Sequence, residues 1–362
     1  MKEHYISIIN NLYAACDCDA LIISSPSDTL YLTGYTSSDI IIVIDSNSRY
    51  IFTDKRYTTE LSALLGDVYE IVDGNIGDIY KHLRGLKRIG IDEDISYSQF
   101  LLTVNTFNDY TYDGKSDTRL LIPIHSVISK IRAVKSECEI KAIERSQSIT
   151  DSAFKEIKHY IKRGVSEIEI AARLDYLINS MGARTAFDTI VAFGENTACP
   201  HAHPSFRQLK DGEFVTMDFG AKLNGYCSDM TRTLAFGSAD AEMRKVYDSV
   251  LRANIIGISA LRAGKSGCDV DKEARDYLTS CGYGEFFTHS LGHSVGIDIH
   301  EEPVLSARNS KPLLSGTVIT IEPGVYIPGK FGVRIEDMLK ITEEGAYNLT
   351  KSSKSLIIID GN

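Results

Sequence analysis

The first residues that could do chemistry are two aspartates within residues 215–234, VTMDFGAKLNGYCSDMTRTL. Asp218 and Asp229 lie on either side of Asn224-Gly225, which favours a tight hairpin because both central residues of a type I′ turn need positive φ. With the turn there, Asp218 lies opposite Thr231, and Asp229 becomes its diagonal neighbour on the same face, about 7–8 Å away. Alone, this pattern leaves open whether the pair holds an ion or is solvated on an exposed face.

A second pair of acids, Glu322 and Glu336, repeats this arrangement around the turn PGKFG at 328–332. With the turn centred on residue 330, Glu322 faces Met338 and has Glu336 as its diagonal neighbour. Pro323 indicates an edge strand or a bulge, because proline cannot donate to a strand ladder. Two hairpins that each place two carboxylates on one face favour a shared site over scattered surface charge.

Three of the nine histidines lie in the glycine-punctuated stretch HSLGHSVGIDIH, namely His289, His293 and His300. A lone histidine is more often structural than a ligand, but three in one short stretch favour a site. Four carboxylates with one imidazole suit manganese, iron, cobalt or zinc, and they suit two ions that share bridging carboxylates. Carboxylates alone would suit magnesium or calcium better.

The composition excludes several classes of protein. The chain has 362 residues, of which 43% are hydrophobic, and a net charge of −10, which argues against a nucleic-acid surface. The sequence has no signal peptide pattern and no apolar run of the roughly 18 residues that a membrane span needs. Its seven cysteines include no CxxC pair and fit reduced thiols. We therefore expect a cytoplasmic protein that binds neither nucleic acid nor membrane.

The order of the expected elements predicts two domains. Strands and helices alternate in residues 1–125, which favours a small α/β domain, and residues 126–135 form a junction. In residues 136–362 the order is helix, helix, strands, and then the same again, which predicts an α+β domain with two similar halves. Capping boxes mark the starts of the first two helices, at Ser136 with Glu139 and at Ser166 with Glu169.

Five stretches of the second domain resemble the pita-bread metallopeptidases, and most of all their Xaa-Pro dipeptidase (prolidase) and Xaa-Pro aminopeptidase branch. They come in family order and read FDTIVAFGENTACPH, DFGAKLNGYCSDMTRT, HSLGHSVGIDIHEEP, TIEPGVY and GVRIEDM. TDKRY and IRAVKSECEI, nearer the N-terminus, resemble this branch too. The resemblance covers nearly the whole chain. It implies a catalytic pita-bread (creatinase/aminopeptidase-like) domain, a creatinase-type N-terminal domain and a homodimer.

The resemblance also implies roles for individual residues. The ligands of two divalent ions, manganese first and otherwise cobalt, zinc or iron, would be Asp218, Asp229, His293, Glu322 and Glu336. Asp229 and Glu336 would bridge, or nearly bridge, the two ions. His201 and His300 would contact the substrate and the reacting carbonyl, and Arg334, in the same substrate region, would hold a carboxylate ligand in place.

These roles predict hydrolysis of the Xaa-Pro bond at the N-terminus of proline-containing dipeptides or short peptides, by a hydroxide that bridges the two ions. Glu322 would accept the proton of the water and pass one to the proline nitrogen. Val304 follows HEEP where several prolidases have an arginine, which is implied to meet the free carboxylate of a dipeptide. The choice between dipeptidase and aminopeptidase P activity therefore stays open. Ser290 and Ser294 also stand where many members have glycine.

Three alternatives share this fold. A creatinase-type hydrolase works without metal, but its ligand positions are replaced, whereas all five are intact here. A non-catalytic binding module is disfavoured by the intact ligands and by the acidic charge. A methionine aminopeptidase is the nearest rival, but the additional domain at 1–125 fits the Xaa-Pro branch better.

Overall fold

The computed structural model describes residues 2–37, 39–83, 85–92, 95–106 and 120–361. The chain divides after Arg132 into two compact units. Among the described residues, no helix combines the length and the apolar composition that a membrane crossing requires.

The N-terminal unit is built on a six-stranded mixed sheet of order β4-β3-β2-β1-β5-β6. The central strand β1 pairs antiparallel with β2 and parallel with β5, which confirms an α/β domain. Its strands are β1 (Ala20–Ile23), β2 (Ile41–Asp45), β3 (Arg49–Thr53), β4 (Glu70–Asp73), β5 (Arg88–Ile91) and β6 (Leu120–Pro123). Its helices are α1 (Lys2–Ala15), α2 (Pro26–Thr33), α3 (Lys55–Leu65), α4 (Ile76–Leu83), α5 (Tyr97–Thr106) and α6 (His125–Ala133), the last of which reaches the division between the units.

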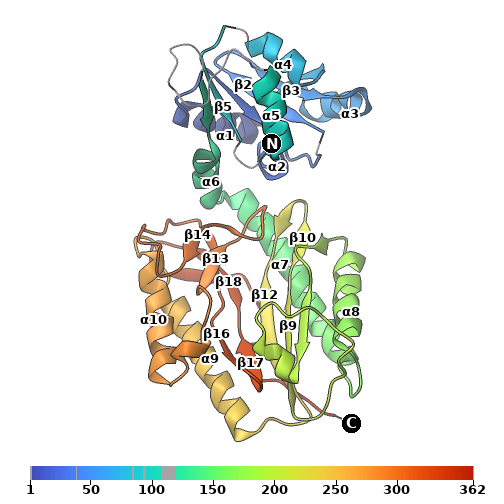
Figure 1. The fold of residues 1–362 in the computed structure, drawn as a ribbon, viewed down its shortest axis with the longest axis vertical. Coiled ribbons are helices and arrows are strands. Elements are labelled where there is room, and N and C mark those ends of the chain that lie inside the picture. The colour runs from blue at the N-terminus through green and yellow to red at the C-terminus, as the bar shows by residue number, and fades with distance from the viewer. Residues whose placement is uncertain (1, 38, 84, 93–94, 107–119, 362) are drawn as a thin grey trace. The chain divides into compact units, whose positions relative to one another are not determined.

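The first half of the second unit consists of helices α7 (Glu137–Ile157) and α8 (Glu167–Ser180) and a sheet of order β20-β12-β9-β8 (Figure 1). Both helices begin with the predicted capping boxes, in which the serine side chain and the glutamate side chain each accept a backbone N–H. The sheet strands are β8 (Ile190–Phe193), β9 (Glu213–Phe219), β12 (Met230–Phe236) and β20 (Ile358–Ile359). A small sheet beside them contains β7 (Arg184–Thr185), β10 (Ala221–Leu223) and β11 (Tyr226–Cys227).

The second half repeats this plan. Helices α9 (Ala241–Ala260) and α10 (Gly267–Ser280) accompany a sheet of order β14-β13-β15-β18-β19 and a separate hairpin β16-β17. The strands are β13 (Gly292–Ser294), β14 (Glu301–Leu305), β15 (Val318–Ile321), β16 (Gly324–Ile327), β17 (Phe331–Arg334), β18 (Asp337–Ile341) and β19 (Ala346–Asn348). In Figure 1 the strands of both halves lie between the pair α7 and α8 and the pair α9 and α10. Two similar α+β halves, the pita-bread arrangement, are therefore confirmed.

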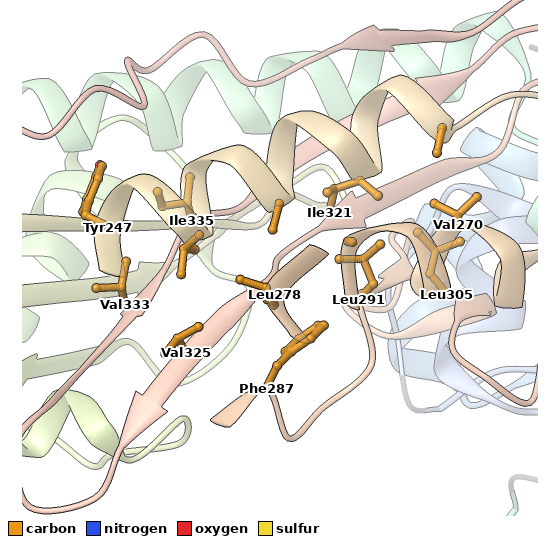
Figure 2. Close-up of a cluster of buried hydrophobic side chains, with 14 of the residues drawn as sticks. Tyr247, Val270, Leu278, Phe287, Leu291, Leu305, Ile321, Val325, Val333 and Ile335 are labelled. Atoms are coloured by element: carbon orange, nitrogen blue, oxygen red, sulfur yellow. The ribbon is translucent and has the colours of Figure 1, made fainter. Parts of the chain in front are cut away.

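The buried core of the second half contains the residues that directly precede the two glutamates. Ile321 and Ile335 are fully buried and pack with apolar side chains of α9 and α10 (Figure 2). Because successive residues of an extended strand point to opposite faces, the next residues, Glu322 and Glu336, point away from this core. Apolar packing on one side thus turns both carboxylates toward the other side.

The first hairpin has the predicted register. Asn224 and Gly225 take φ angles of 50° and 88°, as a type I′ turn requires. Thr231 on β12 pairs with Asp218 on β9. The geometry that placed both aspartates on one face is thus present.

The predicted register of the second hairpin was wrong. Met338 pairs with Thr320, and Glu322 therefore does not face it. The loop is the three-residue segment 328–330 between Ile327 and Phe331, because Gly329, with a φ of 72°, takes the turn one residue earlier than expected. The resulting shift of two residues keeps every side chain on its predicted face, since strand side chains alternate with a period of two.

At Gly292, β13 packs closely against β15. A Cβ at this position would lie 2.0 Å from the backbone oxygen of Thr320. We expect Gly292→Ala to lower the free energy of unfolding by about 1–3 kcal/mol, as other overpacking changes do. Gly345→Ala is the control, because a Cβ there meets no heavy atom of the described residues within 4 Å. Equal denaturant midpoints for the two variants would contradict the expectation.

Candidate metal centre

Three of the five predicted ligands come together between the two halves. The ligand atoms of Asp229, His293 and Glu336 all lie within 4.8 Å of one another. Asp229 directly precedes β12 in the first half, whereas His293 on β13 and Glu336 before β18 belong to the second. Two carboxylates and one imidazole at such distances form a donor set that transition-metal ions accept.

The other two predicted ligands, Glu322 and Asp218, lie outside this group of three. Glu322 Oε1 is 3.4 Å from His293 Nε2. Asp218 Oδ2 accepts a hydrogen bond from Arg334 Nη2 at 2.6 Å, whereas its Oδ1 is buried and has no partner among the described residues. A buried carboxylate oxygen without a partner is costly, so this atom fits a site that receives a cation.

The pKa values of the carboxylates in the site also favour a bound cation. Burial, followed by the charges of Glu336 and Asp218, raises the pKa of Asp229 well above its ordinary value. Burial and the neighbouring Glu336 do the same to the pKa of Glu322. Burial and Asp218 raise the pKa of Glu336 to about 8. Crowded, desolvated carboxylates resist ionisation unless positive charge lies between them, and a divalent ion supplies that charge.

His293 is held in the form that can bind a metal. Burial, followed by the neighbouring His300, lowers the pKa of His293 to about 4, so the ring is neutral. Its Nδ1 lies 3.2 Å from the carbonyl oxygen of Ser294, which can only accept, so Nδ1 carries the proton. The lone pair of Nε2 is therefore free, and that atom is 3.6 Å from Asp229 Oδ2.

Arg334 orients two of the carboxylates from within the protein. Besides Asp218, it donates from Nε to Thr231 Oγ1 at 2.9 Å. Thr231 in turn donates its hydroxyl hydrogen to Glu336 Oε2 at 2.8 Å. Arg334 is 4% exposed, so its contacts to the acidic residues are screened little by water.

The two outer histidines, His201 and His300, are both exposed. The ring of His300 lies edge-on to His293, with 4.3 Å between the ring centres. His201 follows Pro200, whose carbonyl oxygen accepts a hydrogen bond from Arg334 Nη1 at 3.2 Å. The loop that carries His201 is therefore joined to the residue that holds Asp218.

Two further residues belong to this network, Tyr326 and Thr231, for which the sequence predicted no role in the site. Tyr326 accepts from Arg334 Nη1 at 2.8 Å and lies 2.9 Å from His289 Nε2. Because His289 Nδ1 donates to the carbonyl of Ser290, the tyrosine hydroxyl donates to Nε2. Both residues lie inside stretches quoted above, TIEPGVY and DFGAKLNGYCSDMTRT, but only their contacts show what they do.

A buried ion pair and a hydrogen bond anchor the two ends of the segment 294–301, which carries His300 and directly follows His293. Lys135 Nζ lies 3.0 Å from Glu301 Oε2, with both side chains almost fully buried. It also donates to Ser294 Oγ at 3.1 Å, and that hydroxyl donates to the carbonyl of Val318. Ser294, one of the two departures from the glycines of many relatives, therefore has a structural partner.

Comparisons with known proteins agree with this geometry. The sequence matches metallopeptidase family M24 over residues 141–343 and the creatinase/prolidase N-terminal domain over residues 8–134. It is 37% identical to the uncharacterized peptidase YqhT of Bacillus subtilis, over 97% of this chain and 99% of that protein.

Two solved structures are also similar. An Xaa-Pro dipeptidase from Bacillus anthracis has a TM-score of 0.92 at 36% identity, over 98% of this chain and 99% of the other.

An X-Pro aminopeptidase from Thermotoga maritima has a TM-score of 0.88 at 35% identity, over 96% of this chain and 99% of the other. Family match and structural likeness each extend over both domains. The chain is therefore a metallopeptidase of family M24, with a creatinase/prolidase N-terminal domain in front of its pita-bread domain.

Proposed function

We propose that this enzyme hydrolyses the bond between an N-terminal residue and a following proline, in dipeptides or short peptides. The observation that carries the proposal is the buried acidic cluster with neutral His293, in which Asp218 Oδ1 has no partner among the described residues. The proline specificity is supported by the two similar structures, one an Xaa-Pro dipeptidase and the other an X-Pro aminopeptidase.

The ligands of two divalent ions would be Asp218, Asp229, His293, Glu322 and Glu336. Such ions would supply an activated water molecule as nucleophile and would polarise the scissile carbonyl. The mixture of carboxylates and imidazole supports manganese, with cobalt, zinc or iron as alternatives.

Three side chains would act on the substrate itself. Glu322 would take a proton from the water and return one to the proline nitrogen. This nitrogen has no N–H of its own and is a poor leaving group unless it receives that proton. His201 and His300, both exposed, would donate hydrogen bonds to the carbonyl oxygen as negative charge develops on it.

Two further expectations stay predictions, the cellular compartment and the oligomeric state. All seven cysteines are free thiols, which supports a reducing, cytoplasmic environment. The homodimer rests on the family resemblance alone.

Glu322→Gln tests the proton transfer. The amide keeps the shape of the side chain but cannot accept the proton, so we expect kcat to fall by about 10²–10⁴-fold. Metal content must be measured beside kcat, because the change also removes a ligand. Glu344→Gln, at an exposed turn, is the control with unchanged activity. An E322Q enzyme with full metal and full activity would refute the base assignment.

Val304 would bear on the choice between dipeptides and longer peptides. It pairs directly with His293 across β13 and β14, so both side chains share a face of the sheet. Without a cation at this position, we expect cleavage of Leu-Pro-Pro to exceed cleavage of Leu-Pro. Val304→Arg should raise kcat/KM for Leu-Pro roughly tenfold or more, through a lower KM, because a charged hydrogen bond contributes about 1.5–3 kcal/mol.

The assay uses chelated enzyme with added Mn²⁺ or Co²⁺, and Met-Ala-Ser as a third substrate. Cleavage of Leu-Pro alone by the wild type would show a strict dipeptidase despite Val304. Cleavage only after Met would refute the Xaa-Pro assignment and favour the methionine aminopeptidase alternative.

The raised pKa values predict how pH changes stability. Glu336 has a pKa of about 8 in the folded protein against an ordinary value of 4.5. The folded state therefore holds this proton more tightly than the unfolded state. Its stabilising effect is complete below pH 4.5 and is lost as the pH rises through 8. Asp229 and Glu322 shift in the same direction.

Metal binding requires the deprotonated carboxylates, so Mn²⁺ should raise the melting temperature more at about pH 8 than at about pH 5.5. The measurement is thermal unfolding at both pH values, with a chelator or with Mn²⁺. In Glu336→Gln without metal, the fall in melting temperature between these pH values should be smaller than in the wild type. An equal fall would contradict the assignment of the raised pKa.

A further inference from the structure

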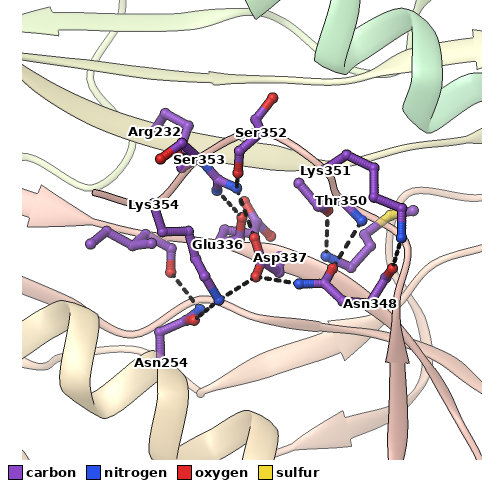
Figure 3. Close-up of polar contacts among 12 residues, drawn as sticks. Arg232, Asn254, Glu336, Asp337, Asn348, Thr350, Lys351, Ser352, Ser353 and Lys354 are labelled. Atoms are coloured by element: carbon purple, nitrogen blue, oxygen red, sulfur yellow. Dashed lines mark hydrogen bonds and ion pairs between the residues drawn. The ribbon is translucent and has the colours of Figure 1, made fainter. Parts of the chain in front are cut away.

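Glu322 and Glu336 both lie where strands are interrupted. β15 ends at Ile321 and β16 begins at Gly324, while β17 ends at Arg334 and β18 begins at Asp337. Peptide groups at such interruptions lack the regular ladder of a sheet, and buried ones must find other partners. The N–H groups of Glu322 and Glu336 bond to the backbone carbonyls of Leu291 and Thr231. The carbonyl oxygens of Ile321, Ile335 and Glu336 are instead bound by side chains of a buried polar cluster (Figure 3).

Arg232 supplies the first of these partners. Its Nη1 donates to the carbonyl oxygens of Glu336 and of Thr231, the latter at 2.9 Å. Its Nη2 donates to Asp337 Oδ1 at 2.8 Å and to the carbonyl of Ser352 at 2.8 Å. Its Nε donates to the carbonyl of Ser353 at 3.1 Å. All five guanidinium hydrogens are thus used, and a lysine, with three donors on one nitrogen, cannot reproduce this set.

Asn254 on α9 supplies the second partner for these backbone groups. Its Nδ2 donates to the carbonyl of Ile321 at 2.8 Å and to that of Ile335 at 3.2 Å. These two residues directly precede the two glutamates. One side-chain amide therefore ties the two interrupted strands together at the positions from which Glu322 and Glu336 project.

Asp337 and Lys354 hold Arg232 and Asn254 in place. Lys354 Nζ lies 2.5 Å from Asp337 Oδ2 and donates to Asn254 Oδ1 at 2.7 Å. This contact fixes the orientation of the Asn254 amide, so that its Nδ2 must face the two carbonyls. The chain Arg232, Asp337, Lys354 and Asn254 is continuous, as the dashed lines in Figure 3 show.

Burying the charged groups of this cluster costs free energy that a purely structural element could avoid. Arg232 and Asp337 are 1% and 0% exposed, and apolar residues of similar volume often stabilise a core as well as a buried ion pair does. What apolar residues cannot do is bind the carbonyl groups beside Glu322 and Glu336. We propose that Arg232 and Asn254 are positioning residues of the metal centre, which set the spacing of these two ligands. This inference rests on the proposed metal site.

Asn254→Leu tests the proposal, because leucine has a similar size but donates no hydrogen bond. The matched control is Val250→Ala, one turn earlier on α9, which is equally buried and removes only apolar contact. Both variants should lower the melting temperature of the metal-free enzyme. Only Asn254→Leu should weaken Mn²⁺ binding, by about tenfold or more in a calorimetric titration, as loss of groups that orient ligands does.

Arg232→Lys gives the same comparison should Asn254→Leu fail to fold, since it keeps the positive charge opposite Asp337. It should also weaken Mn²⁺ binding and lower kcat with little change in KM. Mn²⁺ affinity in Asn254→Leu or Arg232→Lys equal to that of Val250→Ala would overturn the inference and leave the proposed function intact. A wild-type enzyme that binds no Mn²⁺, cobalt, zinc or iron would instead overturn the proposed function itself.

Discussion

The structure depends on the burial of several carboxylates beside one another. In a medium of low dielectric constant such groups repel one another and resist ionisation, and this is why the pKa values of Asp229, Glu322 and Glu336 rise. A protein tolerates this arrangement when other groups compensate for it. The compensation comes from Arg334 on Asp218, from the hydroxyl of Thr231 on Glu336, and from the cation that the site is shaped to receive.

The two halves of the catalytic domain contribute to the site differently. The first half supplies two aspartates from a hairpin with a regular register, in which the turn alone determines which face they occupy. The second half supplies its glutamates from interrupted strands, where neighbouring backbone carbonyls are bound by side chains. Around these glutamates lie the apolar core that contains Ile321 and Ile335 and the polar contacts of Arg232 and Asn254. The site joins a locally specified pair to a pair that only long-range contacts can place.

Substrate choice is a separate matter from the chemistry. The metal ligands determine that an amide bond is attacked, whereas positions around them determine which peptide fits. Val304, across the ladder from His293, would be such a position under the proposed function, and it carries no charge here. Relatives of the same fold, one an Xaa-Pro dipeptidase and one an X-Pro aminopeptidase, are almost equally similar to this chain. Overall likeness therefore does not discriminate between the two activities, and side chains near the centre must.

The sequence by itself determined the features that depend on local backbone chemistry. Asn224-Gly225 placed Asp218 opposite Thr231, and two Ser-x-x-Glu boxes located the starts of α7 and α8, because these signals act over a few residues. For the second hairpin the predicted register was wrong, because Gly329 places the turn one residue earlier. The predicted faces of its side chains were nevertheless right, because a register shift of two residues preserves the alternation of side chains.

Only the tertiary structure decided which groups hold the ligands. Arg232 contacts Glu336 across 104 positions of sequence, and Asn254 contacts Ile321 across 67. No local pattern marks Tyr326 or Asn254 as different from any other buried polar residue. Their roles follow from strands that are far apart in the chain but adjacent in the fold, where each buried carbonyl must find a donor.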